Sequence, residues 1–193
     1  MIHLPGSPTE QISEWLSRFG AALGRMDRAA AAGLFADECY WRDLISFTWN
    51  IKTLEGKDEI QAMLAATISD VQPNDWQILG EATEEDGVTA GWFRFETAVA
   101  RGKGYLRLKA GECWTLLTTM TELKGFEEKA GPTRVSGTEH GVSRNRKTWL
   151  ERKTQEEAEL GYATQPYCVI IGGGQGGIGL AARLKRLGRS FRP

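Results

Sequence analysis

Six consecutive residues near the C-terminal end form a glycine-rich turn: Gly172, Gly173, Gly174, Gln175, Gly176 and Gly177. The turn fits the pattern G-x-G-x-x-G, follows the apolar run 168–171 and precedes a helical segment rich in Ala and Leu. A strand, a glycine turn and a helix in this order are the context that a dinucleotide-binding turn requires. The first glycine permits the tight bend, the second lets a pyrophosphate approach the backbone, and the third lets helix and strand pack closely. Because the free N–H groups at the start of the helix attract phosphate, we predict that this turn binds a nucleotide cofactor.

The composition is that of an ordinary globular protein and excludes several classes of function. The chain has 193 residues, 41% of them hydrophobic and 25% charged, with a net charge of −1. We therefore expect no nucleic-acid partner and no attachment to an anionic membrane. Three widely spaced cysteines without a CxxC pair, and an N-terminus without signal-peptide character, favour a cytoplasmic protein. No cluster of residues has metal-ligand spacing, so no metal site is predicted.

The elements that must position these residues change character along the chain. A capping box at 7–10 begins a helix, and two more helical segments at 27–35 and 56–68 lie on either side of a strand at 39–45. Aromatic and β-branched residues then alternate in four predicted strands, 76–79, 88–99, 104–110 and 113–123. Helices followed by a run of antiparallel strands are typical of an α+β fold rather than of alternating β-α-β units.

Three segments are predicted from this pattern. Residues 7–126 form the α+β domain, residues 127–165 a linker that contains a charged helix, and residues 166–193 the strand, the glycine turn and the following helix. The linker is indicated by glycines and prolines among polar residues, and its helix by opposite charges at helical spacing. A dinucleotide-binding fold needs more strands than residues 166–193 supply. We therefore expect this chain to be the front of a longer protein.

Three helices followed by a curved antiparallel sheet resemble the cone fold of the nuclear transport factor 2-like (NTF2-like), polyketide-cyclase-like superfamily. The resemblance covers residues 7–126 and rests on the order of the elements. It implies an apolar pocket between sheet and helices, in which an Asp or His acts as acid or base. The residues expected in the wall or mouth of that pocket are Trp41, Asp43, Trp92, Arg94, Tyr105, Arg107 and Trp114.

Asp43 is the pocket candidate for catalysis, because it lies on the first predicted strand and shares a face with Trp41. As a general base it would need burial without a cationic partner. The alternative is a structural carboxylate that ends the strand or pairs with one of three arginines, Arg42, Arg94 or Arg107. We predict the structural role.

The stretch 167–177 resembles the FAD-binding start of the NADPH-dependent flavin-containing monooxygenases, including their YUCCA-type relatives. A subgroup of these flavoproteins carries a cone domain ahead of this turn, joined by segments that resemble 113–119, 124–126 and 149–152. The resemblance implies a Rossmann-type domain in which residues 172–177 hold the pyrophosphate of FAD, with NADPH as co-substrate. The chain lacks the acidic ribose-binding residue, the second dinucleotide fold and the FxGxxxH signature of that family.

These observations lead to one main hypothesis and two alternatives. The main hypothesis is the N-terminal part of an FAD- and NADP-dependent monooxygenase, an oxidoreductase that acts on a small organic substrate and is inactive as this fragment. The alternatives are a small-molecule-binding or dimerisation module of the cone fold, and a cone-fold isomerase or dehydratase that uses Asp43. We also expect a homodimer through the open sheet face, because the aromatic-rich strands would otherwise expose a large apolar surface. Residues 166–193 are expected to be loosely placed and to bind FAD weakly.

Overall fold

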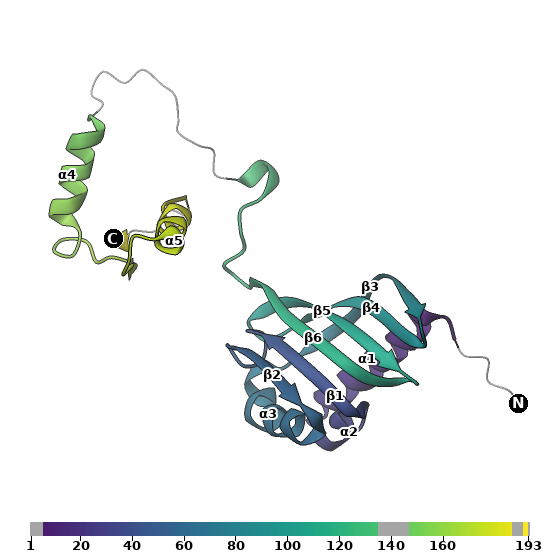
Figure 1. Cartoon of the computed structure of the whole chain (residues 1–193). Helices are drawn as coiled ribbons and strands as arrows, with labels where there is room; N and C mark the ends of the chain where they lie inside the picture. The colour runs from purple at the N-terminus through teal and green to yellow at the C-terminus, as the bar shows by residue number, and fades with distance from the viewer. Residues whose placement is uncertain (1–5, 135–146, 187–190, 193) are drawn as a thin grey trace, which may run out of the picture. The chain divides into compact units, whose positions relative to one another are not determined.

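The computed structural model of the chain describes residues 6–134, 147–186 and 191–192. The chain divides into two compact units, residues 1–128 and 129–193, and each is described by itself below (Figure 1). None of the helices in the described ranges is long and apolar enough to cross a membrane.

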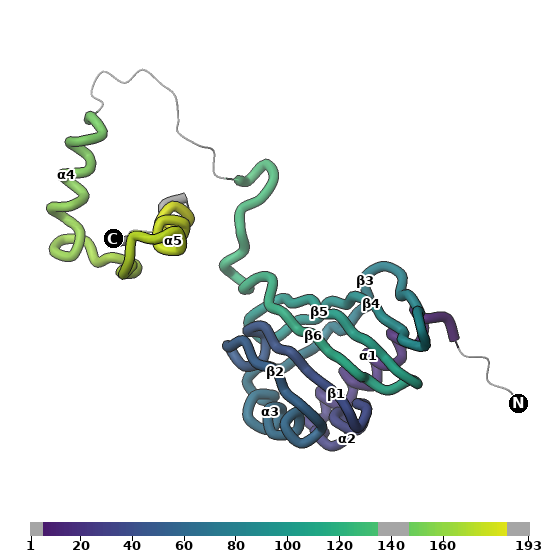
Figure 2. The backbone as a smooth tube through the Cα atoms, in the orientation of Figure 1, coloured from purple at the N-terminus to yellow at the C-terminus, as the bar shows by residue number. Residues whose placement is uncertain are grey.

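A six-stranded sheet forms the frame of the first unit (Figure 1). Its strands lie in the order β2-β1-β6-β5-β4-β3, and all neighbours are antiparallel except β1 and β6, which run parallel. These two strands lie side by side in the sheet although they are far apart in the sequence (Figure 2). The bounds are β1 Phe35–Leu44, β2 Ile51–Glu55, β3 Asn74–Glu85, β4 Val88–Glu96, β5 Ala100–Lys109 and β6 Glu112–Leu123.

Three helices cover one face of this sheet: α1 (Pro8–Gly24), α2 (Arg28–Ala32) and α3 (Gly56–Val71) (Figure 1). We call the covered face the inner face and the opposite one the outer face. α1 packs on β3 and β4, whereas α3 packs on β1 and β2. The predicted capping box is confirmed, because the Glu10 N–H donates to the Ser7 hydroxyl and the Ser7 N–H donates to the Glu10 carboxylate.

The apolar stripe of α1 explains why this helix lies against the sheet. Its buried residues recur at helical spacing and are Ile12, Trp15, Leu16, Phe19, Ala22 and Leu23. Burying a large apolar side chain stabilises a fold by about 1.5–3 kcal/mol. The stripe therefore fixes the orientation of α1 on the inner face.

Two glycines in β5 make room for the aromatic core. Gly102 and Gly104 pair with Phe95 and Phe93 of β4, and both phenylalanines are buried. A Cβ atom at Gly104 would lie 2.2 Å from the Phe93 ring and 2.2 Å from the carbonyl oxygen of Leu117. Because protein interiors are close-packed, only a residue without a Cβ atom leaves space for the ring at this position.

The predicted α+β order is confirmed, but several bounds differ from the prediction. The helix predicted at 27–35 ends at Ala32 and β1 already begins at Phe35, and β5 begins at Ala100 rather than at 104. The strand predicted at 76–79 extends over the whole of β3 and ends at a hairpin turn, Asp86-Gly87, where both residues have positive φ angles of 51° and 75°. The strand predicted at 88–99 ends at Glu96. There the Thr97 hydroxyl accepts a hydrogen bond from the Ala100 N–H at 2.9 Å, and this local contact favours a turn over a continued strand.

β2 was not predicted from the sequence. It lies at an edge of the sheet, and Leu54 is its one buried residue. A strand with one exposed face and one neighbour needs little apolar alternation, so its sequence carries a weak signal.

The second unit contains the charged helix and the glycine turn. Its elements are a 3-10 turn at Gly131–Thr133, α4 Trp149–Glu159, β7 Cys168–Val169, α5 Gln175–Arg186 and β8 Phe191–Arg192. β7 and β8 pair in parallel, with α5 between them in the sequence. Part of the predicted linker, residues 135–146, lies outside the described residues.

Candidate functional site

The sheet divides the seven predicted pocket residues between its two faces. Trp41 and Asp43 of β1 are fully buried on the inner face. The other five lie on the outer face and are exposed or half-buried: Trp92, Arg94, Tyr105, Arg107 and Trp114. Side chains alternate between the faces of a strand, and in β4 it is Phe93 and Phe95 that point inward. The prediction that all seven residues line one pocket is therefore wrong.

The carboxylate of Asp43 is surrounded by hydrogen-bond donors. Its Oδ1 accepts from the Thr118 hydroxyl at 2.8 Å and from the Ser46 N–H at 3.2 Å. Its Oδ2 accepts from the Phe47 N–H at 3.0 Å, and from the N–H and hydroxyl of Thr48 at 2.9 and 2.8 Å. A carboxylate offers about four lone-pair sites, and this one meets five donors.

These contacts bear on the two roles considered for Asp43. The predicted arginine partner was wrong, because the Asp43 contacts are hydroxyl and backbone N–H groups; Arg42 and Arg94 donate instead to Thr53 and Gln77. Lone pairs that are all engaged leave none for a substrate proton. The geometry therefore favours a structural carboxylate that holds the chain segment after β1.

That segment, the 45–50 loop, has an unusual backbone. Ile45 and Trp49 have positive φ angles of 61° and 52°. Such angles are rare for β-branched or bulky residues and cost about 1–3 kcal/mol each. The loop is closed by a hydrogen bond from the Ile45 N–H to the Asn50 carbonyl oxygen at 3.0 Å. It turns Phe47 inward, with 1% of its surface exposed, and Trp49 outward, with 62% exposed.

The Phe47 ring joins an aromatic cluster in the interior of the cone. Its centroid lies 4.9 Å from that of Trp41 and 6.0 Å from that of Phe95. Phe95 in turn stacks on Trp76 at 4.9 Å, with the ring planes 12° apart. The indole Nε1 of Trp76 is buried and has no hydrogen-bond partner among the described residues. The cluster therefore contains one unused donor.

The outer face combines apolar and cationic side chains. The strand register places Leu79, Trp92, Tyr105 and Leu117 in one row across β3, β4, β5 and β6. Leu79 and Trp92 are 42% and 45% exposed, and the ammonium group of Lys103 lies 5.4 Å from the centre of the Trp92 ring. In the same way the Arg107 guanidinium lies 4.4 Å from the centre of the Trp114 ring.

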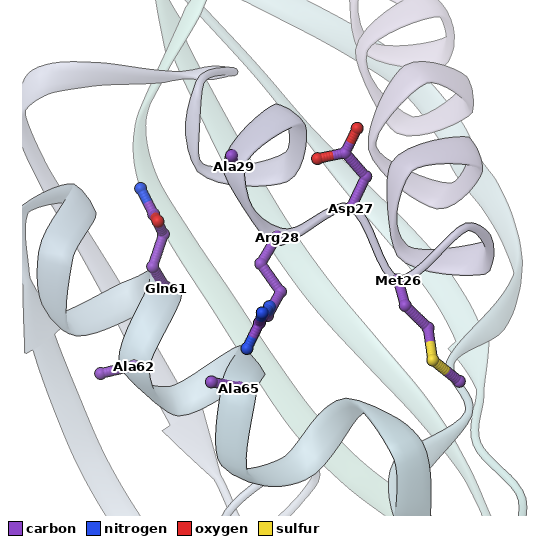
Figure 3. Close-up of a pocket in the computed structure, with 7 residues that line it drawn as sticks. All are labelled: Met26, Asp27, Arg28, Ala29, Gln61, Ala62 and Ala65. Atoms are coloured by element: carbon purple, nitrogen blue, oxygen red, sulfur yellow. The ribbon is translucent and has the colours of Figure 1, made fainter.

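A hollow of about 450 Å³ lies between the α1–α2 turn and α3 (Figure 3). Its lining residues are Met26, Asp27, Arg28, Ala29, Gln61, Ala62 and Ala65. The Arg28 side chain points into it toward Ala65, whereas Asp27 turns away (Figure 3) and caps α2 by accepting from the Ala30 N–H at 2.9 Å. No strand contributes to this hollow, so it is separate from the aromatic interior.

The buried thiols are poorly suited to nucleophilic chemistry. Burial raises the pKa of the Cys113 thiol well above its ordinary value, and the nearby Cys39 raises it further. Burial also raises the pKa of Cys39. Because the thiolate is the reactive form, neither thiol supports catalysis. Within the part of the chain that the structure describes, no three His, Cys, Asp or Glu side chains are placed to hold a metal ion.

The glycine turn joins β7 to α5. Gly172 has a φ angle of 109°, which L side chains rarely adopt. A Cβ atom at Gly177 would lie 2.1 Å from the Gly172 carbonyl oxygen, whereas one at Gly173, Gly174 or Gly176 would meet no atom of the described residues within 4 Å. The first and third glycines of the pattern are therefore required by the backbone itself, and the middle positions are open. Cofactor binding by residues 172–177 stays a prediction.

The first unit has a mixed α+β architecture, with helices packed on one face of the sheet. Residues 16–119 match the SnoaL-like domain family, and the chain belongs to this family. Among solved structures it is similar to an NTF2-like protein of unknown function from Cytophaga hutchinsonii ATCC 33406. The two are 14% identical over 63% of this chain and 95% of that one, with a TM-score of 0.41. No curated protein matches the chain.

Sequence reasoning missed three residues of this site: Phe47, Trp76 and Thr118. A signal existed for Thr118, because alternation along β6 places it on the same face as the buried Leu116. Trp76 was recognised as part of a strand, but not as an unpaired donor. Phe47 had no local signal, since it follows the end of β1 in a loop and its burial depends on the hydrogen bonds of Asp43.

Proposed function

We propose that the SnoaL-like domain binds a small, flat, apolar molecule in the aromatic interior of the cone. The observation that supports this is the buried Trp76 Nε1, an N–H donor without a partner in the described part of the chain, beside the stacked ring of Phe95. Buried polar groups are normally paired, so an orphan donor suggests an acceptor supplied from outside the chain. Ligand sites typically combine apolar walls with a few placed polar groups. An aromatic molecule with one carbonyl oxygen fits this description.

The hydrogen bonds to the Asp43 carboxylate favour ligand binding over acid–base catalysis as the function of this domain. The carboxylate is engaged by five donors, four of them from the 45–50 loop and one from Thr118. A general base needs a free lone pair within reach of the substrate proton. The isomerase or dehydratase alternative therefore has less support than a binding module.

The test uses 9-fluorenone, a flat aromatic ketone, as the probe. Titration followed by the NMR signal of the Trp76 indole N–H is expected to give a saturable shift. Trp76→Phe keeps an aromatic ring but removes the donor, and should weaken binding about three- to tenfold. Trp114→Phe changes the outer face and serves as the control, with unchanged affinity. Equal affinities in both variants, or no saturable binding, would contradict the proposal.

A second candidate function is self-association through the outer face. The row formed by Leu79, Trp92, Tyr105 and Leu117 is apolar and partly exposed, with cations beside it. A contiguous apolar patch with a polar rim is typical of an interaction surface. We propose a homodimer in which the two outer faces meet around a twofold axis. Sedimentation velocity over a range of concentrations tests this proposal, and a monomer at every concentration would contradict it.

A third proposal concerns the glycine turn, which we propose to be the start of an FAD-binding domain of an NADPH-dependent monooxygenase. The positive φ angle of Gly172 and the close approach of Gly177 to it support this, because both are what the pyrophosphate turn requires. The open positions at Gly173, Gly174 and Gly176 leave the backbone accessible to a phosphate. Bound FAD would supply the redox chemistry, and residues 172–177 would hold its pyrophosphate through backbone N–H groups.

Two glycines offer a matched test of the FAD proposal. A Cβ atom at Gly174 or at Gly179 meets nothing within 4 Å, so alanine at either position is compatible with the packing. Gly174→Ala should weaken FAD binding, measured by flavin fluorescence, because the second glycine is the point of closest approach to the pyrophosphate. Gly179→Ala lies further along α5 and should bind FAD as the wild type does. The same affinity in both variants would argue against this assignment.

A further inference from the structure

The Phe47 side chain fills part of the aromatic interior from a loop rather than from a strand. Its ring is buried between Trp41 and Phe95, yet residues 45–50 belong to no strand or helix. The ring can therefore leave the interior without breaking the hydrogen bonds that join the strands.

The backbone on both sides of Phe47 is strained. Ile45 precedes it and Trp49 follows it, and both have positive φ angles. Strain of this kind persists only where the surrounding contacts impose it, and it is concentrated in ligand clamps and switch segments. Opening the loop would relax both residues, which offsets part of the cost of exposing the ring.

One side chain outside the loop, that of Asp43, makes several of the hydrogen bonds that hold this conformation. Four of the five donors to Asp43 come from the loop, namely the N–H groups of Ser46, Phe47 and Thr48 and the hydroxyl of Thr48. The fifth comes from Thr118 of β6, which anchors the carboxylate to the sheet. Asp43 thus joins the loop to the sheet at one point.

The unused donor belongs to a ring that Phe95 separates from Phe47. Phe47 contacts Phe95, and Phe95 stacks on Trp76, whose Nε1 has no hydrogen-bond partner among the described residues. Withdrawal of the Phe47 ring would connect solvent to this aromatic cluster. The space that the ring vacates has the flat shape and the apolar walls that an aromatic ligand needs.

We infer that the 45–50 loop is a gate that Asp43 holds closed, and that a flat aromatic ligand with a hydrogen-bond acceptor replaces the Phe47 ring when the gate opens. The inference rests on the proposed small-molecule function and adds its regulation. A ligand that binds only the open state has its apparent affinity reduced by the fraction of molecules that are open. Removing hydrogen bonds of Asp43 should therefore increase the open fraction of the loop and the apparent affinity for the ligand by the same factor.

Loop opening and ligand affinity are measured separately in the full chain. Amide hydrogen exchange of Phe47 and Thr48, followed by NMR, reports loop opening without any ligand. Titration with 9-fluorenone reports binding. Asp43→Asn removes the charge and replaces one acceptor by a donor, so exchange of both amides should rise at least about tenfold. The apparent affinity for 9-fluorenone should rise by a similar factor.

A matched control lies on the same strand. Asp37→Asn changes an exposed carboxylate of β1 whose partner is Lys57 at 2.8 Å, and should change neither quantity. If Asp43→Asn does not fold, Thr48→Val removes one donor to the carboxylate and should give smaller changes in the same direction. Phe47→Ala removes the ring that the ligand would replace. In the Phe47→Ala background, Asp43→Asn should therefore no longer increase the affinity for 9-fluorenone.

The outcomes separate the gate from the binding function. Unchanged exchange of Phe47 and Thr48 in Asp43→Asn, relative to Asp37→Asn, overturns the gate. Faster exchange without tighter binding overturns it as well, provided that Phe47→Ala binds the probe. If no variant binds the probe, including Phe47→Ala, the small-molecule function fails, and exchange still decides whether Asp43 holds the loop closed.

Discussion

The inner and outer faces of the sheet use the same strands but hold their aromatic residues in different ways. Phe93 and Phe95 on the inner face are buried among other rings and above the two glycines of β5. Trp92, one position away, is 45% exposed and contacts Tyr105 and the Lys103 ammonium group. Position within the two-residue period, not residue type, therefore decides which ring belongs to the core and which to a surface.

Both faces also contain charged groups, in opposite environments. On the inner face the Asp43 carboxylate is fully buried and engaged by five neutral donors. On the outer face Arg101 and Lys124 pair with Glu96, Glu122 and Glu127 in a network of partly exposed side chains. Burial makes each contact on the inner face costly to lose, whereas solvent screens the outer network.

The largest expected difference separates adjacent residues of β4. Phe93→Ala should lower the free energy of unfolding by about 3–5 kcal/mol, since it removes a fully buried ring and leaves a cavity. Trp92→Ala should cost less than about 1 kcal/mol in the monomer, because only cross-strand surface contacts are lost. Urea unfolding at low protein concentration measures both. Similar losses in the two variants would refute the division into core and surface.

The glycines of β5 allow the same comparison by adding atoms instead of removing them. Gly104→Ala should lower the free energy of unfolding by about 3 kcal/mol, because its Cβ atom would collide with a backbone carbonyl oxygen as well as with Phe93. Lys103→Ala, at the exposed position beside it, should change stability by no more than about 0.5 kcal/mol. Urea unfolding again measures both values. A tolerated Gly104→Ala would mean that the Phe93 ring has room to move.

Self-association should respond to the outer face alone. Trp92→Glu places a charge in the centre of the apolar row and should raise the dissociation constant of the proposed dimer at least about tenfold. Sedimentation equilibrium measures this constant. Glu84→Gln, a substitution of an exposed residue of β3, serves as the control and should leave it unchanged. If Trp92→Glu dimerises as the wild type does, the contact surface lies elsewhere.

The smallest expected effect concerns pH and the outer-face network. The hydrogen bond from Lys124 holds the pKa of Glu96 below its ordinary value of 4.5, and the charges of Lys124 and Arg101 contribute. A carboxylate with a lowered pKa adds stability that is fully present above the ordinary value and is lost as the pH falls through the folded value. Lys124→Met should therefore make unfolding slightly less sensitive to acid below pH 4.5. Thermal unfolding between pH 3 and 6 measures this difference, on the order of a few degrees at most; an unchanged pH profile would show that the pair adds no stability.

Many of the helix ends and turns of the fold could be predicted from short sequence patterns. The capping box at Ser7 and Glu10 was predicted, because it depends on residues only a few positions apart. The helix cap at Asp27 and the Asp86-Gly87 hairpin depend on equally local sequence. The conformation of Gly172 also follows from local backbone requirements. By contrast, the parallel contact of β1 with β6 joins distant segments, and no local pattern specifies it.

The sequence by itself determined the α+β order and the glycine turn at 172–177, because these depend on short-range periodicity and sterics. Only the tertiary structure decided which face each aromatic residue occupies and what Asp43 binds. The partner of that carboxylate is Thr118, 75 residues away, together with a loop that closes back on β1. Such contacts depend on how strands pair and in which register, and a shift of one residue would reverse the two faces.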